Sequence, residues 1–157
     1  MRIIYTTRGK DPALTSNGTF LGSEAFIERY PRHTQRVVNT VLRAAKWLGD
    51  LDKNPSPAFM LWTKSGVQFS NYKEDYLGGA SGPPGESVKR RTNPLIDEYL
   101  AARYTQNIAD ALKFKLLRNS FRFEDWVDRR FLNAGLKELG LEQYWQPEPA
   151  GGKKPQG

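Results

Sequence analysis

Residues 92–145, TNPLIDEYLAARYTQNIADALKFKLLRNSFRFEDWVDRRFLNAGLKELGLEQYW, are the longest stretch in which hydrophobic spacing, helix-capping residues and helix-stopping residues agree. Pro94 suits a first helical position, which does not need a backbone N–H, and Asn93 or Thr92 before it suits the N-cap. The sequence therefore predicts a helix from Pro94. Its apolar residues recur at the spacing of one buried face: Leu95, Ile96, Tyr99, Leu100, Ile108, Ala111, Leu112, Leu116 and Leu117.

A second helix is predicted further along the same stretch, with Asp128 as a capping residue. Its apolar stripe consists of Phe131, Leu132, Leu136 and Leu139. Gly140 before Leu141 is typical of a left-handed helix stop that is closed by an apolar contact. Residues 147–157 are rich in Pro and Gly, and we expect a flexible tail there.

The first half of the chain predicts one short strand followed by helices. Residues 2–6 are β-prone, and residues 18–21 or, less well, residues 67–69 are the candidate strands to pair with them. Ser23 can cap a helix over residues 24–29, and Pro31 begins a longer helix that extends to about Leu48. Short helices are expected at residues 57–64 and after Ser70, and the Gly-Pro run at residues 78–85 predicts a loop.

Composition excludes some classes of protein and leaves others open. The chain has 157 residues, a formal charge of +7, 38% hydrophobic residues and no cysteine. We expect it to fold, without disulfides or thiolate metal sites. No stretch is apolar enough for a membrane span, and residues 1–22 lack the pattern of an export signal. The charge leaves open a stand-alone helical module that binds nucleic acid, in which Lys89, Arg90 and Arg91 would share one face with the arginines of the Pro31 helix.

Catalytic, metal and cofactor sites are not predicted. His33 is the single histidine and cannot form an ordinary zinc site without other ligands. The acidic pairs lie at helix starts or on polar faces, where the helix dipole accounts for them. The loop from Arg8 to Ser23 is a better candidate, because Arg8, Thr15, Ser16 and Thr19 precede a helix N-terminus in a manner that suits a small anion.

A series of short motifs in a fixed order resembles the C-terminal half of the nitrate/sulfonate/taurine-type substrate-binding proteins of bacterial ABC importers. The resemblance extends over nearly all of residues 2–146 and is carried by residues 5–7, 19–31, 35–38, 44–47, 61–66, 94–97, 116–118, 126–132, 134–141 and 144–145. It implies a periplasmic protein that binds a small solute between two lobes and delivers it to a membrane permease, with no catalysis. It further implies that Thr19 and Phe20 face the solute, with Thr15, Ser16 and Arg8 as weaker additions.

The resulting expectation is a mostly α chain with a short β element, derived from an α/β parent. Residues 1–146 would form the C-terminal portion of a two-lobed binding protein, with a strand and cleft loop at 1–22 and helices at 23–146. Because the rest of that parent is missing here, we expect an exposed apolar face or self-association that covers it.

Overall fold

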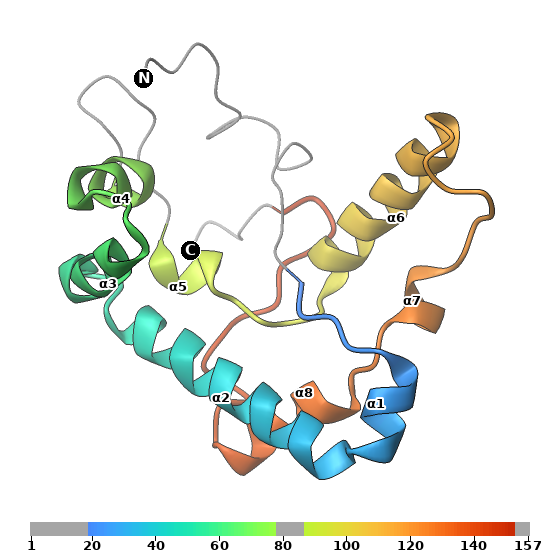
Figure 1. The fold of residues 1–157 in the computed structure, drawn as a ribbon, viewed down its shortest axis with the longest axis horizontal. Coiled ribbons are helices and arrows are strands. Elements are labelled where there is room, and N and C mark those ends of the chain that lie inside the picture. Colours follow the sequence, from blue (N-terminus) through green and yellow to red (C-terminus); the bar gives the residue numbers. More distant parts are fainter. Residues whose placement is uncertain (1–18, 78–86, 153–157) are drawn as a thin grey trace. The chain divides into compact units, whose positions relative to one another are not determined.

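The computed structural model describes residues 19–77 and 87–152, and the backbone of these two ranges is helical, with no strand (Figure 1). The predicted strand at residues 2–6 and the predicted loop at 78–85 lie outside the described residues. Neither candidate partner strand is present in the described part, because Thr19–Leu21 is irregular and Phe69 opens a helix. The chain divides into two compact units, Met1–Pro94 and Leu95–Gly157.

The first unit begins with a short helix and a long one. The helix α1 spans Glu24–Arg29, and the side chain of Ser23 accepts a hydrogen bond from the Phe26 N–H, which confirms the predicted cap. The backbone leaves helical geometry at Tyr30, as expected before a proline. The helix α2 then spans Pro31–Asp50 with Pro31 in its first turn, as predicted, and it packs on α1.

Four further helical elements complete the described part of the first unit, and Phe59 on one of them is fully buried. They are α3 (Ser56–Trp62), the 3-10 turn η2 (Thr63–Ser65), α4 (Phe69–Leu77) and α5 (Val88–Arg91). The helix α3 packs on α4, and α5 packs on α2 through the buried Val88. Ser70 does not cap α4 as predicted, because that helix already begins at Phe69.

The second unit begins with α6 (Glu98–Lys113), which differs at both ends from the predicted helix. The N-cap is Asp97 rather than Asn93 or Thr92, and its Oδ1 accepts a hydrogen bond from the Leu100 N–H at 3.0 Å. Its Oδ2 accepts from the Glu148 N–H at 2.8 Å. Residues 93–97 are therefore irregular, since Asp97 is held by a segment distant in the sequence. At the other end the helix stops at Lys113, and Leu116 is 79% exposed instead of buried.

Two shorter helices follow, α7 (Phe123–Trp126), which packs on α6, and α8 (Arg130–Glu138). Asp128 accepts a hydrogen bond from the Arg130 N–H, but it lies one residue before the N-cap of α8. The predicted stop is confirmed: Gly140 has φ +64°, and the Leu141 N–H donates to the Leu136 carbonyl at 2.8 Å. Leu136 and Leu141 are both buried.

Candidate functional site

The predicted ligand residues Thr19 and Phe20 lie just before α1 and are exposed, Phe20 by 61%. Arg8, Thr15 and Ser16, which were predicted to accompany them, lie outside the described residues. The helix that they precede has six residues, and Ser23 already accepts the Phe26 N–H through its side chain and the Ile27 N–H through its carbonyl. The start of α1 therefore offers fewer free donors to an anion than the sequence pattern indicates.

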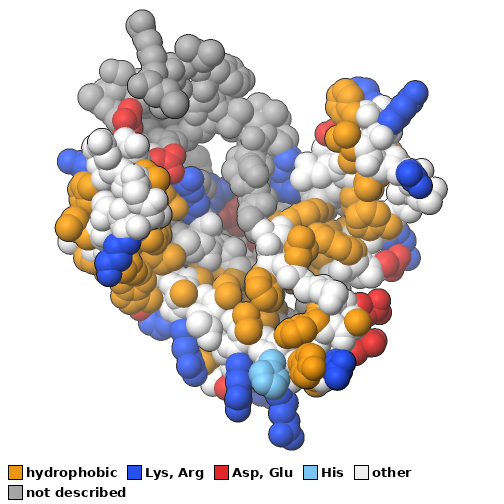
Figure 2. Space-filling model, viewed as in Figure 1, with side chains coloured by type: hydrophobic (Ala, Val, Ile, Leu, Met, Phe, Trp, Pro, Cys, Tyr) orange, Lys and Arg blue, Asp and Glu red, His pale blue; other side chains and the backbone are white. Residues whose placement is uncertain are grey.

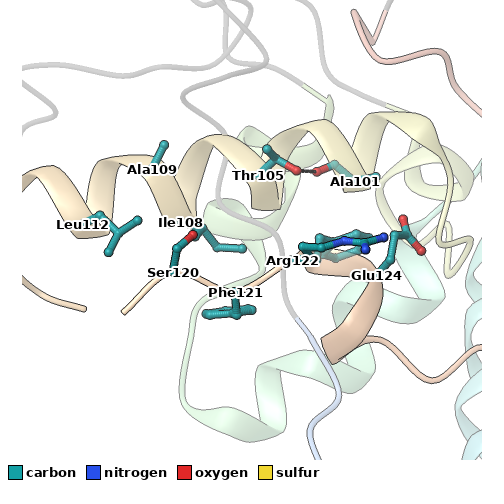
Figure 3. Close-up of a pocket in the computed structure, with 10 residues that line it drawn as sticks. Ala101, Thr105, Ile108, Ala109, Leu112, Ser120, Phe121, Arg122 and Glu124 are labelled. Atoms are coloured by element: carbon teal, nitrogen blue, oxygen red, sulfur yellow. Dashed lines mark hydrogen bonds between the residues drawn. The ribbon is translucent and has the colours of Figure 1, made fainter. Parts of the chain in front are cut away.

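A groove of about 400 Å³ lies within the second unit, between α6 and the segment that returns along it (Figure 3). The helix forms one wall and the segment Ser120–Glu124 forms the other. The lining residues are Ala101, Thr105, Ile108, Ala109, Leu112, Ser120, Phe121, Arg122, Phe123 and Glu124. Helical spacing places residues 101, 105, 108, 109 and 112 on one side of α6, and this side of the helix faces the groove.

The groove differs chemically along its length. Ala109, Leu112 and Ile108 lie toward one end, whereas Arg122 and Glu124 lie together toward the other (Figure 3). The Thr105 hydroxyl donates to the Ala101 carbonyl at 2.8 Å, so its oxygen remains available only as an acceptor. The groove thus combines an apolar floor with a charged end, which is the usual composition of a site for a small amphiphilic molecule.

Arginines hold two acidic side chains of the second unit, Glu124 in the groove and Asp128 four residues further along the chain. A hydrogen bond and ion pair with Arg129 keep the pKa of Glu124 below its usual value. Hydrogen bonds from the Arg130 guanidinium keep the pKa of Asp128 below its usual value in the same way, against a smaller opposing effect of burial. Arg122 is less engaged, since its Nε lies 3.8 Å from Asp125 and its side chain is 78% exposed. Arg122 is the cation among the lining residues, so an anion in the groove would meet its guanidinium beside the Glu124 carboxylate.

Nothing in the sequence pattern singled out this groove. Ile108 and Leu112 were assigned to a buried helical face, while Phe121 and Arg122 were given no role. The available signal was the order Phe121-Arg122-Phe123-Glu124, in which an arginine stands between two aromatic residues just after a helix should end. This order of residues indicates a groove only if the segment returns along α6, and that return is a tertiary contact.

Aromatic residues of the first unit form a packed cluster around Phe59. Ring centroids of Trp62 and Tyr76 each lie less than 6 Å from that of Phe59, at 5.8 Å and 5.5 Å. The Tyr72 hydroxyl donates to the Trp62 carbonyl at 3.3 Å, so the polar end of that ring is also satisfied. Arg91 lies over the Tyr76 ring at 4.1 Å and forms an ion pair with Asp75 at 2.9 Å. The basic run at residues 89–91 thus contributes Arg91 to the structure of the first unit.

Comparisons with known proteins give one informative likeness. The structure is similar to the periplasmic sulfonate-binding protein SsuA of a sulfonate ABC transporter from Methylobacillus flagellatus KT, with a TM-score of 0.68 and 25% sequence identity. The match covers 80% of this chain and 36% of that protein, so the chain spans well under half the length of the protein it resembles. No family model and no curated protein matches the sequence. The chain therefore has a fold like that of part of a sulfonate-binding protein.

In the part of the chain that the structure describes, no helix has both the length and the apolar character needed to cross a membrane.

Proposed function

We propose that this chain is a solute-binding component of an ABC importer and supplies the helical C-terminal portion of the binding protein. The observation that carries the proposal is the likeness of 80% of the chain to a periplasmic sulfonate-binding protein at a TM-score of 0.68. The chain-wide order of motifs that resembles this class of binding proteins supports the same function. A periplasmic location and delivery of the solute to a permease are parts of the same proposal.

The proposed solute is a small organic anion with an apolar portion. The net charge of +7 favours anions at long range. Thr19 and Phe20, with Arg8, Thr15 and Ser16, are the proposed contacts by resemblance. The groove along α6 is a second place for the same kind of solute, because it joins an apolar floor to the exposed guanidinium of Arg122.

Binding can be tested by calorimetry and thermal unfolding of the 157-residue chain with methanesulfonate, propanesulfonate, taurine and nitrate. Propanol serves as the control for the tail alone, and sulfate serves as the control for an anion without a tail. At a concentration of about ten times Kd a ligand stabilises the folded state by about 1.4 kcal/mol. For a chain of this size we expect this to raise Tm by roughly 3–6 °C.

Two variants separate the two candidate positions. Thr19→Val combined with Phe20→Ala should weaken sulfonate binding if the loop before α1 holds the solute. Arg122→Gln should weaken it if the groove does, and each variant serves as the control for the other because the positions lie in different units. A chain that shows neither heat nor a thermal shift with any of these anions would rule out both candidate positions as sites that bind these anions within this chain.

The nucleic-acid alternative predicts that the chain binds a DNA duplex and that its affinity falls steeply as the salt concentration rises. Fluorescence anisotropy with a labelled duplex tests it on the same chain. DNA binding without sulfonate binding would favour that alternative over the importer component.

A further inference from the structure

The segment that follows α6, residues 113–122, combines exposed apolar side chains with a concentration of positive charge. Leu116 is 79% exposed, Phe114 is 66% exposed and Phe121 is 41% exposed. These are large side chains, and isolated soluble proteins rarely expose such residues together. Figure 2 shows hydrophobic side chains interleaved with lysine and arginine side chains at the far end of α6, in the upper right of the view.

Four cations alternate with these apolar residues, namely Lys113, Lys115, Arg118 and Arg122, and all four are exposed. From Ala111 to Phe123 the sequence contains no acidic residue. The ammonium of Lys113 lies 5.6 Å from the centre of the Phe114 ring, so a charge and an aromatic surface are presented side by side. The segment therefore carries four positive charges and no acid of its own, and Arg122 at its end forms an ion pair at 3.8 Å with Asp125.

The backbone holds this arrangement in place. The Leu116 N–H donates to the Ala111 carbonyl at 2.8 Å, and the Lys115 N–H donates to the Leu112 carbonyl at 3.0 Å. This is the hydrogen-bond pattern that closes a helix end, with Lys115 in the left-handed region at φ 58°. The closed turn fixes the backbone that carries Phe114 and Leu116, so their exposure belongs to a defined conformation.

We propose that residues 113–122 dock on the surface of an anionic lipid bilayer. A bilayer interface accepts both features at once, because Lys and Arg reach the phosphate level while Phe and Leu enter the boundary with the acyl chains. A second copy of the chain would bring the same four cations against themselves across a two-fold interface, which is unfavourable. An acidic protein partner would match the charges but would need an apolar surface at the same spacing.

Sedimentation with vesicles tests this inference on the intact chain, with phosphatidylcholine vesicles containing about 30% phosphatidylglycerol compared with pure phosphatidylcholine. We expect binding to the anionic vesicles that weakens as salt rises, since surface charge attraction is screened. Removing two cations with Lys113→Gln and Lys115→Gln should weaken binding at least tenfold, because each lysine near an anionic surface contributes a factor of roughly five. Phe114→Ser with Leu116→Ser should weaken it to a similar extent.

Matched controls come from the first unit. Met60→Ser with Leu61→Ser removes two apolar residues of comparable exposure, 62% and 48%, and Lys64→Gln with Lys73→Gln removes two exposed lysines. Both control pairs should bind vesicles as the unaltered chain does, and circular dichroism should show the same helix content in all variants.

Several outcomes would overturn the inference. They are equal binding to neutral vesicles, no binding to either kind, and equal loss of binding in the control pairs. Sedimentation equilibrium and poly-glutamate binding identify the other occupants: a dimer that Phe114→Ser and Leu116→Ser dissociate would assign the segment to a second copy. Tighter retention of poly-glutamate than of vesicles through the same four cations would assign it to an acidic protein. These readouts do not involve the solute, so this inference and the proposed function fail independently.

Discussion

Two helices in this chain end in the same backbone geometry with different residues at the left-handed position. After α8 the residue is Gly140 at φ +64°, and after α6 it is Lys115 at φ 58°. In both cases the following N–H donates at 2.8 Å to the carbonyl five residues earlier, from Leu141 to Leu136 and from Leu116 to Ala111. An L-residue with a Cβ adopts this conformation at a cost of roughly 1 kcal/mol, whereas glycine does not pay it.

We expect opposite effects from exchanging the residue type at these two positions. Lys115→Gly should raise the free energy of unfolding by roughly 0.5–1 kcal/mol, because relief of the left-handed strain exceeds the extra freedom that glycine gives the unfolded chain. Gly140→Ala should lower the free energy of unfolding by about 1 kcal/mol. A Cβ at this position would meet no atom within 4 Å, so the loss comes from backbone strain and not from a clash. Urea unfolding monitored by circular dichroism measures both changes.

The control for charge at position 115 is Lys115→Gln, which keeps a side chain with a Cβ and should change stability by less than about 0.5 kcal/mol. If Lys115→Gly were no more stable than Lys115→Gln, the strain attributed to the left-handed lysine would be absent.

At the level of the helices, the end of α2 is tied to the start of α5 by one carboxylate. The Asp52 Oδ1 accepts from the Ser87 hydroxyl at 2.8 Å and from the Lys89 N–H at 3.0 Å. Partial burial opposes ionisation of Asp52, but the hydrogen bonds from Lys89, Ser87 and Val88 outweigh it and hold its pKa below the usual value. The carboxylate thus stabilises the N-terminus of a four-residue helix that is too short to be stable alone.

Replacing this carboxylate should lower the free energy of unfolding and make it depend less on pH in the acid range. Asp52→Ala should cost about 1–2 kcal/mol at pH 7, the usual cost of losing a charged capping acceptor. Because the pKa of Asp52 is lower in the folded state, its contribution is complete above the ordinary carboxyl pKa of about 4 and is lost as pH falls through the folded value. Urea unfolding at pH 7 and pH 3 should therefore show a difference between the two proteins that shrinks at pH 3.

Asp52→Asn retains an acceptor oxygen and should lie between the unaltered protein and Asp52→Ala at pH 7. The exposed Glu142 provides a matched acid, and Glu142→Gln should change stability by less than about 0.5 kcal/mol. A constant difference between the unaltered protein and Asp52→Ala at both pH values would contradict a role for the ionised carboxylate.

The accuracy of the sequence-based predictions also depends on the element. The start of α2 at Pro31, the cap at Ser23 and the stop at Gly140 were predicted correctly, because each is set by neighbouring residues. The start of α6 was placed at Pro94 instead of Glu98, since the cap depends on the hydrogen bond between Asp97 and the distant Glu148. Its stop was placed too late, because Lys115 adopts a left-handed conformation that its residue type does not favour.

For the molecule as a whole, the likeness to a binding protein could be predicted from the order of motifs, whereas the groove could not. The motif order indicated a class of binding protein, and the structural comparison shows a fold like that of part of one such protein. The groove is formed when Phe121 and Arg122 return along α6 after the helix stops at Lys113. Periodicity assigns residues to a helical face, but it does not state whether another segment covers that face.

The helix α2 carries apolar side chains that no other described segment fully covers. Val37 and Val41 lie four residues apart on one side of the helix, and they are 42% and 44% exposed. Ala44 continues the same stripe and is also exposed, whereas Leu42 on the adjoining side is fully buried. Part of the apolar surface of this helix is therefore left in contact with water, at a cost that association would reduce.

We expect the chain to associate with itself through this stripe at micromolar concentrations, as measured by sedimentation equilibrium. Because the contact is apolar and the chain carries a charge of +7, raising salt should strengthen association by screening repulsion between copies. Val37→Gln with Val41→Gln should shift the protein toward the monomer by at least roughly tenfold in Kd, since each buried valine contributes about 1 kcal/mol or more. The exposed Arg36 and Arg43 lie outside the stripe, so Arg36→Lys with Arg43→Lys should leave association unchanged. Contacts of this kind form at micromolar concentrations. If the protein stayed monomeric up to about 100 μM, the isolated chain would tolerate the exposed valines.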